Sequence, residues 1–199
     1  LPAAVRQMLV DCVADALSGS AFVRAAIGAR RIERITREAG RAATISILGS
    51  VTAEEMPILV EHLRGEGRLT PAFLMHALCV GRTDFFAAAL TALSGLEERR
   101  VRSILATARF HAVRALLESV GLSRELSGLF VEAIFIWRSA VQSASVEMDN
   151  ITPLLLERKA SLGTLSPAAS ELMEMVAKLA IAEERRRARD HALELALAA

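Results

Sequence analysis

Four arginines at helical spacing form the pattern in this sequence that is best suited to chemistry. Their spacing of i, i+4, i+7 and i+11 places them on one face of a helix: Arg30, Arg34, Arg37 and Arg41. Guanidinium groups bind phosphates and carboxylates through paired hydrogen bonds. The stripe therefore predicts a surface for nucleic acid or another anionic partner. We expect apolar residues on the opposite face: Ile32, Ile35, Ala39 and Ala42.

A solvated helix face is the other interpretation of this arginine stripe. Glu33 and Glu38 flank the arginines, and no aromatic or base-reading residue is interleaved with them. Mixed charge of this kind is typical of a helix surface that faces water. The flanking residues favour the solvated face, and both interpretations stay open on the sequence alone.

Histidines are the next candidates for a site, because histidine can bind metals or transfer protons. The sequence has four, each on a different predicted helix: His62, His76, His111 and His191. The HExxH spacing of zinc proteases and the ExxH spacing of di-iron bundles are both missing. His76 and His111 have apolar neighbours and are the two to examine, with a structural or surface role favoured for each.

The usual local signatures of catalysis or cofactor binding are also missing. The sequence contains no CxxC, no GxGxxG after a strand, no Walker lysine motif and no GxSxG. Acidic residues occur as sequence neighbours, as in Glu54–Glu55, and on a helix such neighbours point about 100° apart. We therefore expect a protein that is not an enzyme and has no catalytic residue, no metal site and no cofactor.

Composition limits the protein class and its surroundings. The chain is 53% hydrophobic but only 4% aromatic, and its abundant alanine and leucine favour helices. The charges nearly balance, with 24 Lys and Arg against 23 Asp and Glu, so no global charge favours nucleic acid or an anionic membrane. We expect Cys12 and Cys79 to be buried hydrophobes in a reducing, cytoplasmic compartment. The longest apolar run, Phe85–Leu90, is far shorter than the roughly 18 residues of a membrane span.

Helix starts and stops can be placed from capping residues. Thr70–Pro71, Thr152–Pro153 and Ser166–Pro167 each set a capping hydroxyl before a proline, and Thr52 with Glu55 forms a capping box. Glycines mark the ends. The predicted helices cover residues 3–18, 21–48 with kinks at Gly28 and Gly40, 53–64, 71–80, 83–94, 97–107, 110–120, 123–148, 153–162 and 167–197.

The helix predicted for 123–148 has apolar residues around more than one face, which indicates a central helix. Before it, residues 69–122 read as short helices separated by Gly81, Gly95 and Gly121. Residues 89–96 align with residues 115–122 at four of eight positions, which hints at duplicated hairpins. Because the first residue is Leu1 rather than Met, the sequence also fits a piece of a longer protein.

A family resemblance rests on this glycine-separated region. It runs through Leu69–Leu74, Gly81, Asp84–Leu90, Leu93, Gly95–Leu96, Arg100–Arg102 and Ile104–Leu105. This pattern resembles the alphaproteobacterial domain-of-unknown-function family 2336, whose members are helical and in some cases carry repeats of the HEAT type. The resemblance implies a helical fold. It carries over no site residue, because the matching positions are mostly apolar or turn-forming.

Together these observations predict an all-α protein of stacked short antiparallel helices, HEAT-like, around a central helix and without a sheet. We expect one domain over residues 1–165 and a long C-terminal helix over 166–199 that is packed at its start. The charged block 183–190 predicts that the end of this helix either frays or pairs with a partner. The expected function is a noncatalytic protein-interaction or scaffold module whose protein partner is unidentified, with a homodimer as one possible assembly. The alternative is the binding of nucleic acid or an anionic surface through the arginine stripe.

Overall fold

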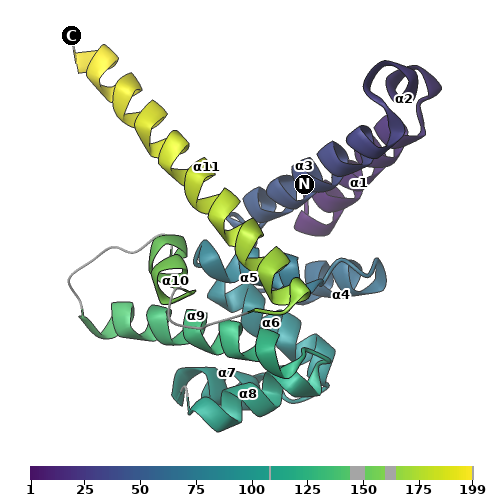
Figure 1. The fold of residues 1–199 in the computed structure, drawn as a ribbon. Coiled ribbons are helices and arrows are strands. Elements are labelled where there is room, and N and C mark those ends of the chain that lie inside the picture. The colour runs from purple at the N-terminus through teal and green to yellow at the C-terminus, as the bar shows by residue number, and fades with distance from the viewer. Residues whose placement is uncertain (108, 144–150, 160–164, 199) are drawn as a thin grey trace. The chain divides into compact units, whose positions relative to one another are not determined.

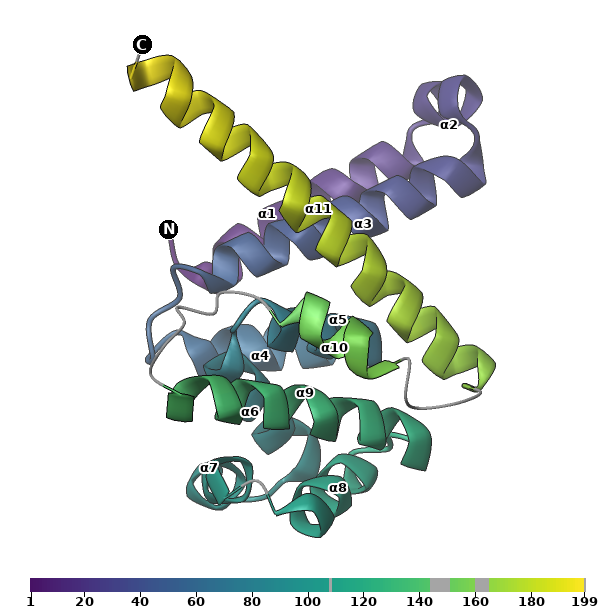
Figure 2. The same ribbon diagram turned by 60° about the vertical axis from the view of Figure 1, so that its left-hand side comes forward.

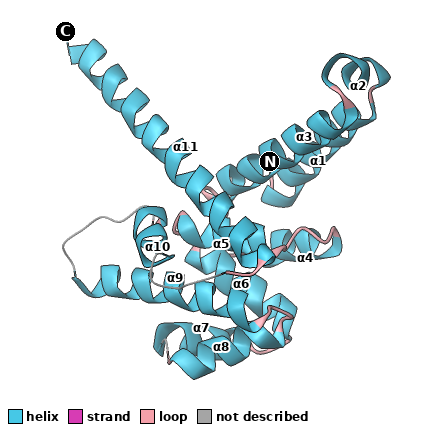
Figure 3. Ribbon diagram, in the orientation of Figure 1, coloured by secondary structure: helices cyan, strands magenta, loops and turns pink. Residues whose placement is uncertain are grey.

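The computed structural model describes residues 1–107, 109–143, 151–159 and 165–198. Every regular element within these ranges is a helix, which confirms the all-α prediction (Figure 3). The chain divides into two compact units, which we call unit 1 (Leu1–Leu69) and unit 2 (Thr70–Ala199). The sequence places no boundary at residue 69, and the boundary it places at 165 stays a prediction.

Unit 1 is built around a pair of long helices. Its elements are α1 (Ala3–Gly19), α2 (Ala21–Ile27), α3 (Ala29–Leu48) and α4 (Met56–Gly65). Helices α1 and α3 lie side by side, with the short α2 at the far end of the pair (Figure 1). The predicted helix 21–48 is therefore two helices, because Gly28 has a φ of 91° that ends α2 and starts α3. At Gly40, where a second kink was predicted, α3 continues.

Small and polar residues form the interface between α1 and α3. Gln7 of α1 and Thr44 of α3 are buried, and the hydroxyls of Ser18 and Thr36 lie 3.1 Å apart across the interface. The Thr36 hydroxyl also donates to the carbonyl of Ile32 at 2.9 Å, within its own helix. The short side chains of Ser18, Thr36 and Thr44 allow the two helix backbones to approach closely.

A polar cluster ties α1 to the end of unit 1. Asp11 of α1 accepts hydrogen bonds from Gln7, at 3.0 Å, and from Arg68. His62 of α4 contributes a ring nitrogen 3.4 Å from the other carboxylate oxygen of Asp11. These partners satisfy a carboxylate that is three-quarters removed from solvent.

Unit 2 contains α5 (Pro71–Cys79), α6 (Thr83–Ser94), α7 (Glu98–Thr107), α8 (Phe110–Ser119), α9 (Arg124–Ser143), α10 (Thr152–Lys159) and α11 (Pro167–Ala198). Helix α9 packs against α5, α8, α10 and α11. In both views α7 and α8 lie on one side of α9 and α10 lies on the other (Figures 1 and 2). Residues 144–148 of the predicted central helix lie outside the described residues.

Burial around α9 explains its central position. Leu129, Phe130 and Val131 are consecutive and therefore point about 100° apart around the helix axis, yet each is at most 2% exposed. The Phe130 ring stacks on Phe86 of α6 with the ring centroids 5.8 Å apart. A helix that is apolar on several sides can be buried only when other helices surround it.

The predicted caps form at several helix starts. Thr70 accepts a hydrogen bond from the amide of Phe73, and Ser166 accepts one from Ala169, both at 3.3 Å. Thr52 and Glu55 exchange the two bonds of a capping box at 3.4 Å, although α4 itself begins only at Met56. Thr152 is the first residue of α10 rather than its cap. Glycines end several helices as predicted, and Gly95 adopts a φ of 67° after α6.

Removing the Phe130 ring should destabilise unit 2 strongly. We expect Phe130→Ala to cost about 3–5 kcal/mol of unfolding free energy, because it leaves a cavity beside the Phe86 ring. The measurement is urea unfolding followed by the fluorescence of Trp137. Phe110→Ala is the matched control in the same unit, since this ring is 40% exposed, and it should cost about 1 kcal/mol or less. Equal losses for the two variants would contradict this account of the core.

Candidate functional site

The predicted arginine stripe lies on α3 in unit 1. Arg30, Arg34 and Arg37 are exposed and Arg41 is half-buried. None of the four forms an ion pair with another residue in the described part of the chain. The helix thus presents a column of positive charges without compensating carboxylates bound to them, and Glu33 and Glu38 beside it are exposed as well.

The apolar residues expected opposite the arginines do not form the packed face of α3. Only Ile32 of the four is buried, whereas Ile35 is 41% exposed and Ala39 and Ala42 are exposed. The packed column contains Thr36, Gly40 and Thr44 as well as Ile32. At Gly40 an added Cβ would lie 3.3 Å from the Arg68 guanidinium, so a glycine, which has no Cβ, suits this close contact.

An exposed apolar stripe runs along α1, and sequence reasoning missed it. Its large members have exposed fractions between 38% and 59%: Val5, Met8, Leu9, Val13 and Leu17. Cys12 and Ala16, which lie on the same helical face, are also exposed. We call these seven residues the α1 stripe. Helix α1 therefore packs its small and polar side against α3 and presents its apolar side outward, the reverse of the usual arrangement.

The histidines remain on four separate helices, as predicted. His62 contacts Asp11, and the His111 ring meets Phe110 edge-on with centroids 5.3 Å apart. His76 is half-buried and His191 is exposed. Among the described residues no group of three or more His, Cys, Asp or Glu side chains could hold a metal ion.

The two cysteines differ, and the prediction that both are buried is wrong for Cys12. Cys79 at the end of α5 is buried, and burial raises the pKa of its thiol to about 12. Cys12 is exposed near the middle of the α1 stripe. Its apolar neighbours in the sequence suggested a core position, but α1 buries the other side of the helix.

A pocket of about 380 Å³ opens within unit 2. Its walls come from α5, α6, α7 and α9: Leu78, Thr83, Phe86, Leu105, Ala106, Ile134, Trp137 and Arg138. The Trp137 indole nitrogen donates to the Leu78 carbonyl at 2.6 Å, so the polar atom of the ring is already bonded. Trp137 lies within the helix that the sequence predicts as central, over residues 123–148. Nothing local could reveal a pocket that four helices build together.

The fold and these surfaces define the class of protein as an all-α protein with exposed apolar and basic helix faces. None of the helices described is long and apolar enough to cross a membrane. The family described as an uncharacterised protein conserved in bacteria, domain-of-unknown-function family 2336, matches residues 1–160, and the chain belongs to it. No curated protein and no solved structure matches the chain. The alphaproteobacterial origin and the HEAT-type repeats stay predictions.

The two thiols should react very differently in dilute solution. We expect a thiol reagent at a pH of about 8 to modify Cys12 quickly, because its thiol is exposed to the reagent. Cys79 should react only after unfolding, because it is buried and its pKa is raised. The measurement is the number of thiols modified with time, with Cys12→Ser as the control that removes the fast phase. Two fast thiols in the native chain would contradict the burial of Cys79.

Proposed function

We propose that this protein is a noncatalytic helical interaction module, and that it associates with a second copy of itself through the α1 stripe. The observation that carries the proposal is the apolar face of α1, where Val13 is 59% exposed and Met8 is 53% exposed. Leaving such a continuous apolar face in water costs free energy, and covering it recovers that free energy.

The size of the α1 stripe supports a specific interface. The exposed parts of its five large side chains amount to on the order of 450 Å² of apolar surface, and a standard interface buries about 800 Å² per partner. Interfaces have an apolar centre and a polar rim, so a stripe of this area suits the centre of one.

The chemistry of the α1 stripe favours a second copy as the occupant. The stripe contains no charged residue, and its apolar side chains complement one another without requiring a matching charge. A two-fold axis would bring the same stripe of two chains together, which is the commonest form of homodimer. Cys12 lies one residue from the midpoint of Val5 and Leu17, so the two Cys12 side chains would lie close together in either helix orientation.

Charged substitutions in the stripe should produce a monomer. We expect the wild-type chain to sediment as a dimer, and the double variant Leu9→Glu with Val13→Glu to sediment as a monomer, because each buried carboxylate would lose its hydration. Both positions are more than half exposed, so the fold should persist, as circular dichroism would show. Leu193→Glu with Leu195→Glu is the matched control on α11, where these residues are 62% and 60% exposed.

Two results would refute self-association through α1. One is a wild-type chain that stays monomeric as its concentration rises from micromolar upwards. The other is a dimer that the α1 variant leaves intact. Thiol modification gives an independent readout, because dimer formation should slow the reaction of Cys12 as the chain concentration increases and a short bismaleimide should link two chains through Cys12.

Anion binding through α3 is a second candidate function, and the unpaired arginines favour it. Charges on one helix face can together contact a phosphate backbone, and each contact adds to the salt dependence of binding. Nucleic acid or another anionic surface would be the partner, and Glu33 and Glu38 would oppose its approach.

Changing all four stripe arginines to glutamine should weaken duplex DNA binding and flatten its dependence on salt, since fewer counterions are released. The measurement is a mobility shift at low and at physiological salt. The matched control removes as many charges from α11 by changing Arg185, Arg186, Arg187 and Arg189 to glutamine. If the stripe variant binds as well as the wild type, or if the α11 control loses as much affinity as the stripe variant, α3 is not the binding surface.

A further inference from the structure

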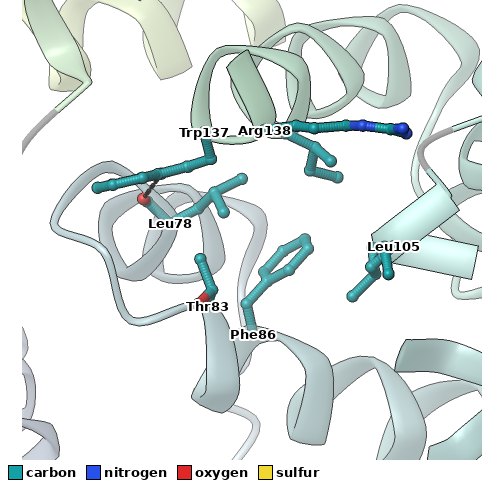
Figure 4. Close-up of a pocket in the computed structure, with 8 residues that line it drawn as sticks. Leu78, Thr83, Phe86, Leu105, Trp137 and Arg138 are labelled. Carbon is teal, nitrogen blue, oxygen red and sulfur yellow. Dashed lines mark hydrogen bonds between the residues drawn. The ribbon is translucent and has the colours of Figure 1, made fainter. Parts of the chain in front are cut away.

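The pocket in unit 2 combines an apolar floor with a cationic rim. Phe86 and Ile134 are buried at its base, and Leu105 of α7 is half-buried at its side. In Figure 4 Trp137 and Arg138 lie across the pocket from Thr83 and Phe86, with Leu78 near Trp137 and Leu105 near Arg138. At about 380 Å³ the pocket lies at the small end of the roughly 300–1,000 Å³ range of ligand sites.

Arg138 is the charged group of this pocket. One of its guanidinium nitrogens donates to the carbonyl of Thr107 at the end of α7. No carboxylate in the described ranges forms an ion pair with Arg138, and a guanidinium has five N–H donors, so donors remain for a ligand. Asp84, the sequence neighbour of Thr83, is paired with Arg102 at 2.8 Å.

The remaining polar groups leave little else for a ligand to bind. The Trp137 N–H is bonded to Leu78, so the indole presents its apolar surface to the pocket. Thr83, the first residue of α6, supplies a hydroxyl on the opposite side. A ligand that matches these walls has one anionic group and a compact apolar body, because a second charge would meet only apolar side chains.

We propose that this pocket binds a small amphipathic carboxylate, of the medium-chain aliphatic acid class. Its hydrocarbon body would lie on Phe86, Ile134 and Leu105, and its carboxylate would accept hydrogen bonds from Arg138. Forked hydrogen bonds between a guanidinium and a carboxylate fix the orientation of the acid as well as its charge. The proposal is independent of association through α1, since every residue that it uses belongs to unit 2.

The protein contains a built-in reporter for this site, because Trp137 is its only tryptophan. Titration of the full chain with decanoate, below its micelle concentration, should change the Trp137 emission and saturate. Decanol has the same hydrocarbon body without the charge, and should bind about tenfold more weakly or worse. Emission that does not saturate with decanoate would overturn the proposal.

Substitutions test the charge and the cavity separately. Arg138→Gln should weaken decanoate binding about tenfold and leave decanol binding unchanged. Arg185→Gln is the matched control, because it removes the same charge from an exposed position on α11. Ala106→Phe, at the exposed rim, should block both ligands by filling the cavity. Decanoate affinity that is equal in the wild type and the Arg138→Gln variant, or binding that survives Ala106→Phe, would refute the site.

Discussion

The burial of α9 is the interaction on which unit 2 depends. A helix with apolar residues on several sides is unstable in water, so α5, α8, α10 and α11 must all pack around it before it is covered. The stacked rings of Phe86 and Phe130 also hold α6 against α9. The pocket is a consequence of this arrangement, because several short helices that meet one long helix cannot fill every space between them.

Local chemistry explains why much of the fold could be predicted. A hydroxyl before a proline fixes a helix start through bonds within four residues, as Thr70 and Ser166 show. A glycine with positive φ ends a helix regardless of what packs on it, as at Gly95. Gly28 and Gly40 mark the limit of this reasoning. Gly28 separates two helices, whereas Gly40 stays within α3 and allows the close contact with Arg68.

The surfaces could not be predicted in the same way, because a single helix does not specify which of its sides will pack. The apolar pattern of α1 predicts a core face that includes Cys12, but the buried side of α3 carries Thr36, Gly40 and Thr44, and Thr36 meets Ser18 on the polar side of α1. The arginine spacing on α3 did predict correctly that Arg30, Arg34 and Arg37 share an exposed face. The pocket involves residues 78 to 138, and no local pattern joins positions that far apart.

The carboxyl end of α5 has a consequence for the order of folding during synthesis. Its last carbonyl groups need partners. The Leu78 carbonyl accepts from the Trp137 indole, and the Cys79 carbonyl accepts from the amide of Ile151 at 3.1 Å. Both donors are made long after α5 leaves the ribosome. Until then the Leu78 carbonyl has only its local bond from the amide of Gly81, at 3.2 Å, and the Cys79 carbonyl has to be bound by water, so the nascent α5 lacks the bonds that later join it to the rest of unit 2.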